Sequence, residues 1–499
     1  MKRPLPFVVI LLAFVCLSIG YVINTPYRTG GIVIFQGGAE SKDIGAPDER
    51  QHANFVARLL EGKGLPVLDP ADLELYENYQ AHQPPLYYFA AAAFSKIVGA
   101  DPKSPETGGR LRFLSTLFGL GTLVGLYFLI RWGEGKEEIA LAGMSIGLMP
   151  MFVGLSSAVS NDPLLYLCIT WSVALAVKAM KQGGDWKSLV ALGIVTAAAF
   201  TTKTTSLALI PVLITGLALA WKSDKGQKLV IGGGLALALV LASPVWLRNM
   251  SLYGDPFALK VFQSSFGGSA QASMFIEAGG ALSYWTQWVA WWTTRSLIGV
   301  FGYMDIYLFE SLGRNPDGSQ KFDQIYLALA FVFGVILLLG ALADKLPKSG
   351  PQMREDDDEE DQKAAGFQWP LVVLGVVVLL LFIQFNRTYF QGQGRYLYPA
   401  LPFFAWLWGR GLEAALRNRG ISWAVGAAVL VGLNLLFLSQ LGPAFAKRTA
   451  VPVSSMGSRY TEPFHGPSLG ENALLLPQTR HEMSSRRGEH LRRHLSKTS

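Results

Sequence analysis

Residues 6–23 read PFVVILLAFVCLSIGYVI, a run without charged residues that follows Lys2 and Arg3. About 20 apolar residues are enough for a helix to cross the hydrocarbon core of a bilayer. The run is long for a cleaved signal peptide, and its small-residue pair, Ser18 and Gly20, makes a weak cleavage site. We therefore interpret it as an uncleaved transmembrane anchor, and this predicts a membrane fold.

The composition of the whole chain agrees with this interpretation. Of its 499 residues, 51% are hydrophobic and 16% are charged, and the mean hydropathy is +0.30, whereas soluble domains contain about 25% charged residues. Cys16 and Cys168 lie in apolar runs, which argues against a disulfide framework. The net charge of +7 comes largely from loops between spans, so it does not indicate nucleic acid as a partner. The chain is predicted to be an all-α polytopic membrane protein.

About eleven apolar segments are predicted to be transmembrane helices, with interfacial helices on the outer face. They lie near residues 6–24, 111–130, 139–157, 163–180, 188–202, 204–221, 229–247, 325–343, 369–386, 398–416 and 421–440. Lys and Arg in the short connecting loops favour a cytoplasmic N-terminus, which places the stretch after the first span outside.

Two further apolar segments are expected to lie at the outer interface. Segment 84–99 is short, opens with a Pro-Pro pair and carries Lys96, and its crossing would invert all the positive loops that follow. Segment 281–304 is long enough to cross, but Arg295 and its many tryptophans suit the interface better.

This topology predicts the domain organisation. We expect an anchor helix at 1–24, a first outer loop with candidate catalytic acids at 25–110, a transmembrane bundle at 111–247, an outer loop at 248–324, transmembrane helices at 325–440 with an acidic inner loop at 344–366, and a polar, basic, disordered tail at 441–499. The topology puts the tail outside, although a basic tail suits the inner side better.

The unusual polar side chains all fall on the outer side in this topology. The candidate site residues are Asp48, Glu49, His52, Glu77, His82, Asp162, Lys203, Arg248 and Arg395. A transporter more often places charges at mid-membrane on broken helices. Ionisable groups gathered at one interface instead indicate an enzyme that acts where a lipid headgroup meets an external acceptor.

The segment PDERQH (47–52) allows two interpretations. A helix that starts at Asp48 would use this residue as its N-cap, with Gln51 at the third helical position. Asp48 and His52 also share the edge of the apolar face of that helix, which would hold a carboxylate at the level of the lipid headgroups. The residue is therefore either a helix cap or a catalytic acid.

The other candidates also have structural alternatives. Glu77 and His82 are candidate ligands of a divalent metal or donors to a phosphate, although a lone histidine is more often structural. Asp162 precedes a proline, which suits either a helix start or a second acidic site residue. Lys203 lies between two apolar spans, where a lipid phosphate would provide the counter-charge.

Arg248 and Arg395 lie beside turn-forming glycines and prolines on the outer side. Charges that set membrane orientation belong on the inner side, so these two arginines need another reason. Arginine binds phosphate oxygens through two parallel hydrogen bonds, which makes both candidates for holding a lipid phosphate.

These motifs, in this order, resemble the GT-C integral-membrane glycosyltransferases, above all protein O-mannosyltransferases and bacterial aminoarabinose transferases. The resemblance covers roughly residues 1–420. It is carried by Asp48-Glu49, QPPLYY (83–88), SNDPLL (160–165), TTKTT (201–205), WLRNMSLYGDPF (246–257) and GRYLYPALP (394–402).

The resemblance implies an inverting sugar transfer from a polyprenyl-phosphate donor to a lipid, glycan or protein acceptor. The reaction would occur on the periplasmic or extracellular face of the cell membrane. Asp48 would take the proton of the acceptor hydroxyl, Glu49 would orient or assist it, and Asp162 would match the second-loop acid of the family. Lipid-phosphate binding would involve Lys203, Arg248 and Arg395.

Several alternatives stay open at this stage. His52 departs from the mannosyltransferase pattern, which leaves the use of a divalent metal undecided. A transporter or flippase of lipid-linked saccharides, a polysaccharide polymerase or ligase, and a polytopic subunit without activity are the other interpretations of the sequence.

Overall fold

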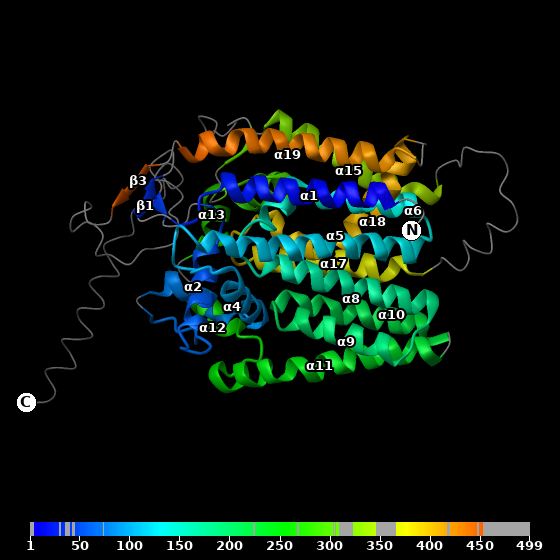
Figure 1. The fold of residues 1–499 in the computed structure, drawn as a ribbon, viewed down its shortest axis with the longest axis horizontal. Helices are drawn as coiled ribbons and strands as arrows, with labels where there is room; N and C mark the ends of the chain where they lie inside the picture. Colours follow the sequence, from blue (N-terminus) through cyan, green and yellow to red (C-terminus); the bar gives the residue numbers. More distant parts are fainter. Residues whose placement is uncertain are drawn as a thin grey trace, which may run out of the picture.

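The protein is described here from a computed structural model, in which long helices run side by side in one bundle (Figure 1). The described residues are 4–28, 31–34, 40–41, 45–72, 74–222, 225–266, 269–302, 304, 306–308, 323–345, 366–416, 420–446 and 449–452. The long helices are α1 (Pro4–Asn24), α5 (Arg112–Glu134), α8 (Asp162–Gln182), α11 (Lys225–Tyr253), α15 (Gln324–Leu342), α17 (Gln368–Asn386) and α19 (Ser422–Ala446). Within the described ranges, seven helices are long and apolar enough to cross a membrane.

The four other predicted spans are shorter or interrupted helices. They are α9 (Trp186–Phe200), η4 (Thr204–Ala208) with α10 (Leu209–Leu219), η9 (Gly394–Ala400) with α18 (Leu401–Leu416), and the run α6 (Glu137–Met144), η3 (Ser145–Leu148) and α7 (Pro150–Leu155). The last run breaks before Pro150, because proline has no amide hydrogen to continue the helix of the preceding turn. The prediction of an α-helical multi-pass membrane protein is confirmed.

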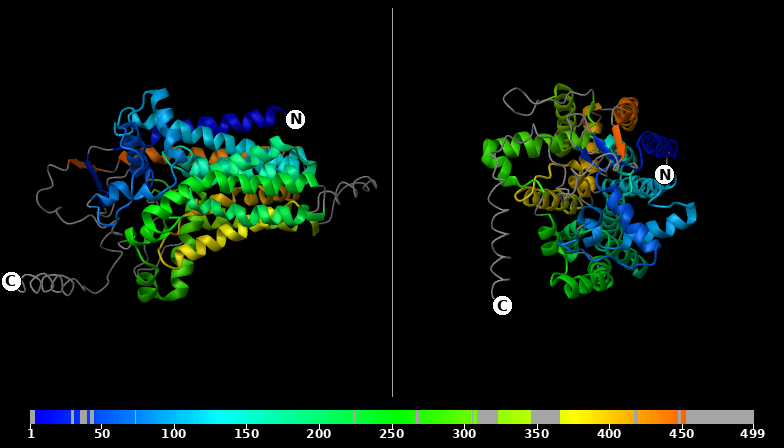
Figure 2. Two further views of the ribbon diagram at one scale, coloured as in Figure 1. Left: turned by 90° about the horizontal axis from the view of Figure 1, so that it is seen from below. Right: turned by 90° about the vertical axis from the view of Figure 1, so that its left-hand side faces the viewer.

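Short helices connect the spans. They are α2 (Glu49–Leu60), α3 (Leu75–Asn78), η1 (Tyr79–His82), α4 (Leu86–Val98), η2 (Gly108–Leu111), η5 (Ala220–Lys222), α12 (Leu259–Ser265), α13 (Ala272–Ser283), η6 (Tyr284–Ala290), α14 (Trp291–Ile298) and η8 (Ala343–Lys345). The elements α2, α4 and α12 lie together at one end of the bundle, and Figure 2 shows from two further directions that the first loop projects there (Figures 1 and 2). With 13 residues, α4 is too short to cross a bilayer upright.

A small antiparallel sheet joins the segment after α1 to the segment after α19. Its strands are β1 (Gly31–Ile34), β2 (Glu40–Ser41) and β3 (Thr449–Pro452), in the order β2-β1-β3, with Val33 opposite Ser41 and Ala450. Because β1 follows the first span and pairs with β3, strand β3 lies on the same side of the bundle as the start of the first loop. The acidic stretch 354–363 and the tail from residue 453 lie outside the described residues.

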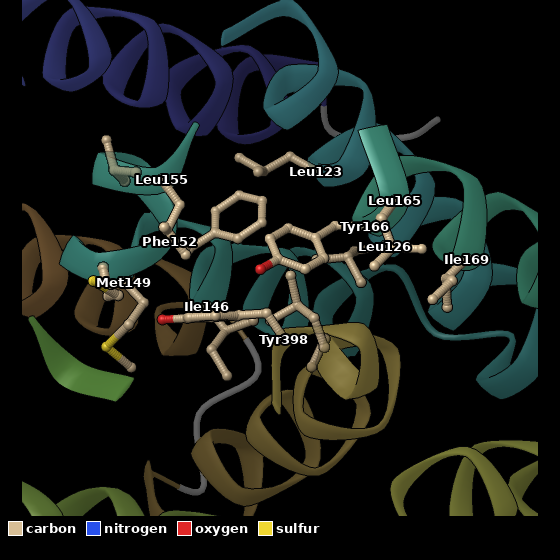
Figure 3. Close-up of a cluster of buried hydrophobic side chains, with 14 of the residues drawn as sticks. Leu123, Leu126, Ile146, Met149, Phe152, Leu155, Leu165, Tyr166, Ile169 and Tyr398 are labelled. Atoms are coloured by element: carbon tan, nitrogen blue, oxygen red, sulfur yellow. The ribbon is translucent and has the colours of Figure 1, made fainter. Parts of the chain in front are cut away.

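A buried aromatic cluster connects α7, α8 and η9. The rings of Phe152, Tyr166 and Tyr398 meet with centroid separations of 5.7–6.0 Å (Figure 3). The hydroxyl of Tyr166 donates a hydrogen bond of 2.9 Å to the carbonyl oxygen of Arg395. Packing of this kind gives the start of η9 a fixed position relative to the first residues of α8.

Helices α15 and α18 approach each other through glycines. A Cβ on Gly340 would lie 2.0 Å from the carbonyl oxygen of Leu407, and one on Gly411 would lie 1.9 Å from that of Ile336. Real atoms do not come this close, so the absence of side chains at both positions permits the contact between the backbones.

Candidate active site

Asp48 occupies the N-cap position of α2, as the sequence predicts. Its backbone is left-handed, with φ 65°, a conformation that Asp adopts more readily than most residues. Within the described chain its carboxylate makes no cap hydrogen bond. Instead Oδ1 accepts a hydrogen bond from the hydroxyl of Tyr79, and Oδ2 accepts one of 2.7 Å from Nη2 of Arg395. The side chain is thus turned away from its own helix.

The surroundings of Asp48 favour its charged form. Burial raises the pKa of Asp48, but the charge of Arg395 and the hydrogen bond from Tyr79 lower it, and the net pKa lies below the ordinary value of 3.8. Burial opposes the charge of Arg395, but the Asp48 carboxylate raises the arginine pKa well above its ordinary value. The two side chains therefore form an ion pair at neutral pH.

Glu49, the next residue, points into the protein. Its Oε1 and Oε2 accept hydrogen bonds of 2.8 and 2.7 Å from Nε and Nη2 of Arg112, and Oε1 accepts another of 2.8 Å from the amide of Val159. Arg112 also donates to the carbonyl oxygens of Thr25 and Pro26. The pair is buried, so it ties the start of α2 to the end of α1, to α5 and to the loop before α8.

A second ion pair joins the start of α8 to the segment between α9 and η4. Nζ of Lys203 lies 2.5 Å from Oδ1 of Asp162, the first residue of α8. Lys203 has an extended backbone between α9 and η4, and this brings its side chain back to α8. Asn161 donates to the carbonyl oxygen of Thr202 at 3.3 Å, which holds the two loops together.

His82 and Gln83 connect the two ion pairs. Nδ1 of His82 lies 2.7 Å from the carbonyl oxygen of Tyr79, and Nε2 of His82 lies 3.0 Å from Nε2 of Gln83. Asn161 in turn donates to Oε1 of Gln83 at 3.3 Å. Contacts therefore run from Asp48 through Tyr79 and His82 to the residue that precedes Asp162.

Both histidines of this region are neutral at physiological pH. Burial lowers the pKa of His52 to about 3 and that of His82 to about 4. Nδ1 of His52 forms a hydrogen bond of 2.9 Å with the hydroxyl of Tyr88, and the two rings stack. The charges of both ion pairs also influence the pKa of His52, although burial has the largest effect.

Glu77 and Arg248 have separate contacts. Oε2 of Glu77 accepts a hydrogen bond of 2.8 Å from Nδ2 of Asn54 on α2. Nη2 of Arg248 donates to the carbonyl oxygen of Pro66 at 2.7 Å, and Arg248 lines a mainly apolar cavity of about 240 Å³. Gln83 is also in the wall of this cavity, so the cavity borders the contacts between the ion pairs.

The structure thus brings Asp48, His52, His82, Asp162, Lys203 and Arg395 together. In the described part of the chain, no group of three or more His, Cys, Asp or Glu side chains is arranged to hold a metal ion. Gln83 and Asn161 lie in two of the motifs quoted above, but no role was assigned to them. Sequence reasoning missed Tyr79 and Arg112. Arg112 has a recognisable signal, because it is an arginine at the end of a span, as Arg248 is.

Comparison with known proteins supports a common fold. Residues 82–247 match the family model described as dolichyl-phosphate-mannose-protein mannosyltransferase. The oligosaccharyltransferase of Archaeoglobus fulgidus, tethered to an acceptor peptide, is similar over 88% of this chain and 54% of its own, with 13% identity and a TM-score of 0.51. Its match thus covers about half of the archaeal enzyme.

The structure of ArnT from Cupriavidus metallidurans bound to undecaprenyl phosphate aligns over 87% of this chain and 75% of its own, with 13% identity and a TM-score of 0.47. No curated protein matches the sequence. The family match over residues 82–247 and the fold shared with the archaeal oligosaccharyltransferase confirm that this chain is similar to the GT-C integral-membrane glycosyltransferases.

Proposed function

We propose that this protein is a membrane glycosyltransferase that moves a sugar from a polyprenyl-phosphate donor to an acceptor hydroxyl, with Asp48 as the general base. The observation that carries the proposal is the gathering of the Asp48 carboxylate with the basic side chains of Arg395 and Lys203 in one network of contacts. The description of the matched family, which names a lipid-phosphate sugar, supports the choice of donor.

The proposed reaction is a single displacement at C1 of the donor sugar. The acceptor oxygen forms a bond to C1 while the bond from C1 to the phosphate oxygen breaks, and the electron pair of that bond leaves with polyprenyl phosphate. Asp48 accepts the proton of the attacking hydroxyl. Attack opposite the leaving phosphate inverts the anomeric centre, and general-base catalysis contributes about 10²–10⁴-fold.

Lys203 and Arg395 would stabilise the charge that develops on the leaving phosphate. Preorganised cations act strongly on such a charge because they need no rearrangement during the reaction. Arg395 uses Nη2 for Asp48 and Tyr396, while its buried Nε has no hydrogen-bond partner among the described residues. This nitrogen supplies a donor for a phosphate oxygen without breaking the contact to Asp48.

The remaining candidates receive supporting roles. The buried pairing of Glu49 with Arg112 suits the orienting role and leaves proton transfer to Asp48. Asp162 would set the position of Lys203 through their ion pair. Arg248, at the wall of the apolar cavity, would lie beside the lipid part of the donor rather than beside the reacting carbon.

The reacting groups would face the outside of the cell membrane. This follows from the positive inner loops of the sequence and from the position of the site in the loops that precede α8, η4 and η9. We propose the periplasmic or extracellular side on this ground.

The function is tested with purified protein in liposomes. Undecaprenyl phosphate carrying labelled mannose, glucose or aminoarabinose is supplied together with a membrane extract as the source of acceptors. The proposal predicts release of free undecaprenyl phosphate and transfer of the label to an acceptor. Movement of intact labelled donor between leaflets, without cleavage of the sugar-phosphate bond, would indicate a flippase and contradict the proposal.

A further inference from the structure

The segment Gln391–Arg395 (QGQGR) carries, besides Arg395, two glutamines that the proposed reaction does not use. It connects α17 to η9, and its backbone is fixed at both ends. The amide of Gln391 donates to Oδ1 of the buried Asn386 at 2.9 Å, and the amide of Gly394 donates to Oγ of Ser296 at 2.7 Å. These two hydrogen bonds hold the backbone of the segment in one conformation.

Its two glycines bring the segment against η6 and α14. A Cβ on Gly394 would lie 2.4 Å from the amide nitrogen of Leu297. One on Gly392 would lie 3.2 Å from both the carbonyl oxygen of Trp288 and Cβ of Trp292. The glycines therefore hold the glutamines of this segment beside a row of aromatic side chains.

A chain of hydrogen bonds continues from Asp48 into this segment. Nη2 of Arg395 lies 2.7 Å from Asp48 and 3.2 Å from the hydroxyl of Tyr396. That hydroxyl donates to Oε1 of Gln391 at 3.4 Å, and the same oxygen accepts a hydrogen bond of 3.0 Å from Nε2 of Gln393. The two glutamines are therefore linked to the proposed catalytic base through Arg395 and Tyr396.

Several buried polar atoms of this region have no hydrogen-bond partner among the described residues. They include Oε1 of Gln393, an acceptor, and Nε1 of Trp292, a donor. Both side chains are partly exposed, although these atoms are covered. An unpaired buried polar atom costs about 1–3 kcal/mol, so a ligand group that supplies the missing partner gains a favourable contact.

The chemistry of the two atoms fits a sugar hydroxyl, which both donates and accepts hydrogen bonds. Trp288 and Trp292 stack at 6.3 Å with an interplanar angle of 18°, and Phe390 packs against the edges of both. Such rings present apolar faces to the C–H face of a sugar ring. Amide groups beside aromatic rings match a saccharide better than a purely apolar or purely anionic ligand.

We propose that Gln391, Gln393 and Trp292 form a saccharide subsite next to Asp48 and help determine which sugar is used. Gln393 and Trp292 each bind a hydroxyl of the sugar ring, and the neighbouring aromatic side chains lie beside its apolar face. This inference rests on the proposed function, because it places a sugar beside the base. The sugar belongs either to the donor or to a glycan acceptor.

The test compares wild type with Gln393→Leu and Trp292→Phe. Each is assayed with undecaprenyl-phosphate mannose and glucose and with their monodeoxy analogues, and methyl mannoside and its deoxy series serve as acceptors. Wild type should lose on the order of 10- to 100-fold in kcat/KM when one hydroxyl is missing, because the site's polar atoms then stay unpaired. In both variants this preference should fall to within about 2-fold.

If the variants lose selectivity among the deoxy donors, the subsite binds the sugar of the donor. If they lose selectivity among the deoxy methyl glycosides, it binds the sugar of the acceptor. Gln384→Leu, on the exposed outer part of α17, is the matched control and should keep the wild-type preference. Unchanged selectivity of Gln393→Leu in both series would overturn the subsite.

Equilibrium binding of the same labelled donors and methyl glycosides separates this failure from failure of the proposed function. If wild type binds the sugars selectively but transfers none, the function is wrong while the subsite stands. If Gln393→Leu binds with wild-type selectivity, the subsite is wrong whether or not transfer occurs. Melting temperatures of all variants show that each one is folded.

Discussion

Arg395 donates a hydrogen bond of 2.7 Å to the carboxylate of Asp48, although 347 positions separate the two residues in the chain. The contact joins the loop after the first span to the loop before α18. It therefore depends on the whole bundle rather than on local sequence. Asp48 accepts a second hydrogen bond from Tyr79, so its carboxylate is held in one direction.

This contact predicts how stability depends on pH. The pKa of Asp48 is lower in the folded protein than its ordinary value of 3.8, so the stabilisation is present above that value and is lost as the pH falls through the folded-state pKa. The melting temperature of wild type minus that of Asp48→Asn should be constant near neutral pH and should decrease below about pH 4. A difference that stays constant down to pH 3 would contradict the ion pair.

The buried pair of Glu49 and Arg112 should contribute mainly to stability. Glu49→Gln leaves the arginine buried without its counter-charge, and the loss of one partner of such a pair costs about 3–5 kcal/mol. We expect a clear fall in the melting temperature of Glu49→Gln. Glu61→Gln, which removes an exposed partner of Lys63 and Lys103, should leave it unchanged. Equal melting temperatures of the two variants would contradict this role.

Lys203 should contribute to turnover. Lys203→Met removes a cation that would face the leaving phosphate, and the loss of one such group typically lowers kcat by about 10²–10³-fold. Lys203→Arg should recover part of this activity because it keeps the charge. Lys96→Met, an exposed lysine near the end of α4, should behave as wild type. Turnover is measured as release of free undecaprenyl phosphate. Wild-type turnover of Lys203→Met would show that Lys203 does not act on the leaving phosphate.

The contact between α15 and α18 should not tolerate a side chain at Gly411. In Gly411→Ala the new methyl group would meet the carbonyl oxygen of Ile336, so the two helices must separate. The melting temperature should fall by several degrees. Gly432→Ala on α19 is the control, because no described atom lies within 4 Å of its Cβ position. Similar melting temperatures for the two variants would contradict the packing.

The sequence was sufficient to predict the long membrane-spanning helices, because they follow from the length of apolar runs. The interfacial position of residues 84–99 stays a prediction, and the 13-residue length of α4 is compatible with it. The interrupted course of residues 137–155 was not predicted, because apolar composition does not show where a helix breaks inside a span. The pairing of β3 with β1 was missed, because neither strand has a pattern that specifies its partner.

The candidate site could be predicted in part. Asp48, Asp162, Lys203 and Arg395 were selected as polar residues on the outer side of the predicted topology, and the structure brings them into one network of contacts. The resemblance assigned proton transfer to Asp48 and an orienting role to Glu49, but the residues by themselves did not show where each carboxylate points. Two adjacent carboxylates at a helix start point in different directions, and only the fold shows that Glu49 meets Arg112.

The measurement that tests the central claim most directly compares Asp48→Asn with wild type for both donor binding and turnover. Asparagine keeps the size of the side chain but cannot accept the proton of the attacking hydroxyl. The account predicts that the variant binds undecaprenyl-phosphate sugar within a few-fold of wild type while its turnover falls by at least about 10²-fold. Turnover close to wild type in a folded, donor-binding Asp48→Asn variant would show that Asp48 is not the base.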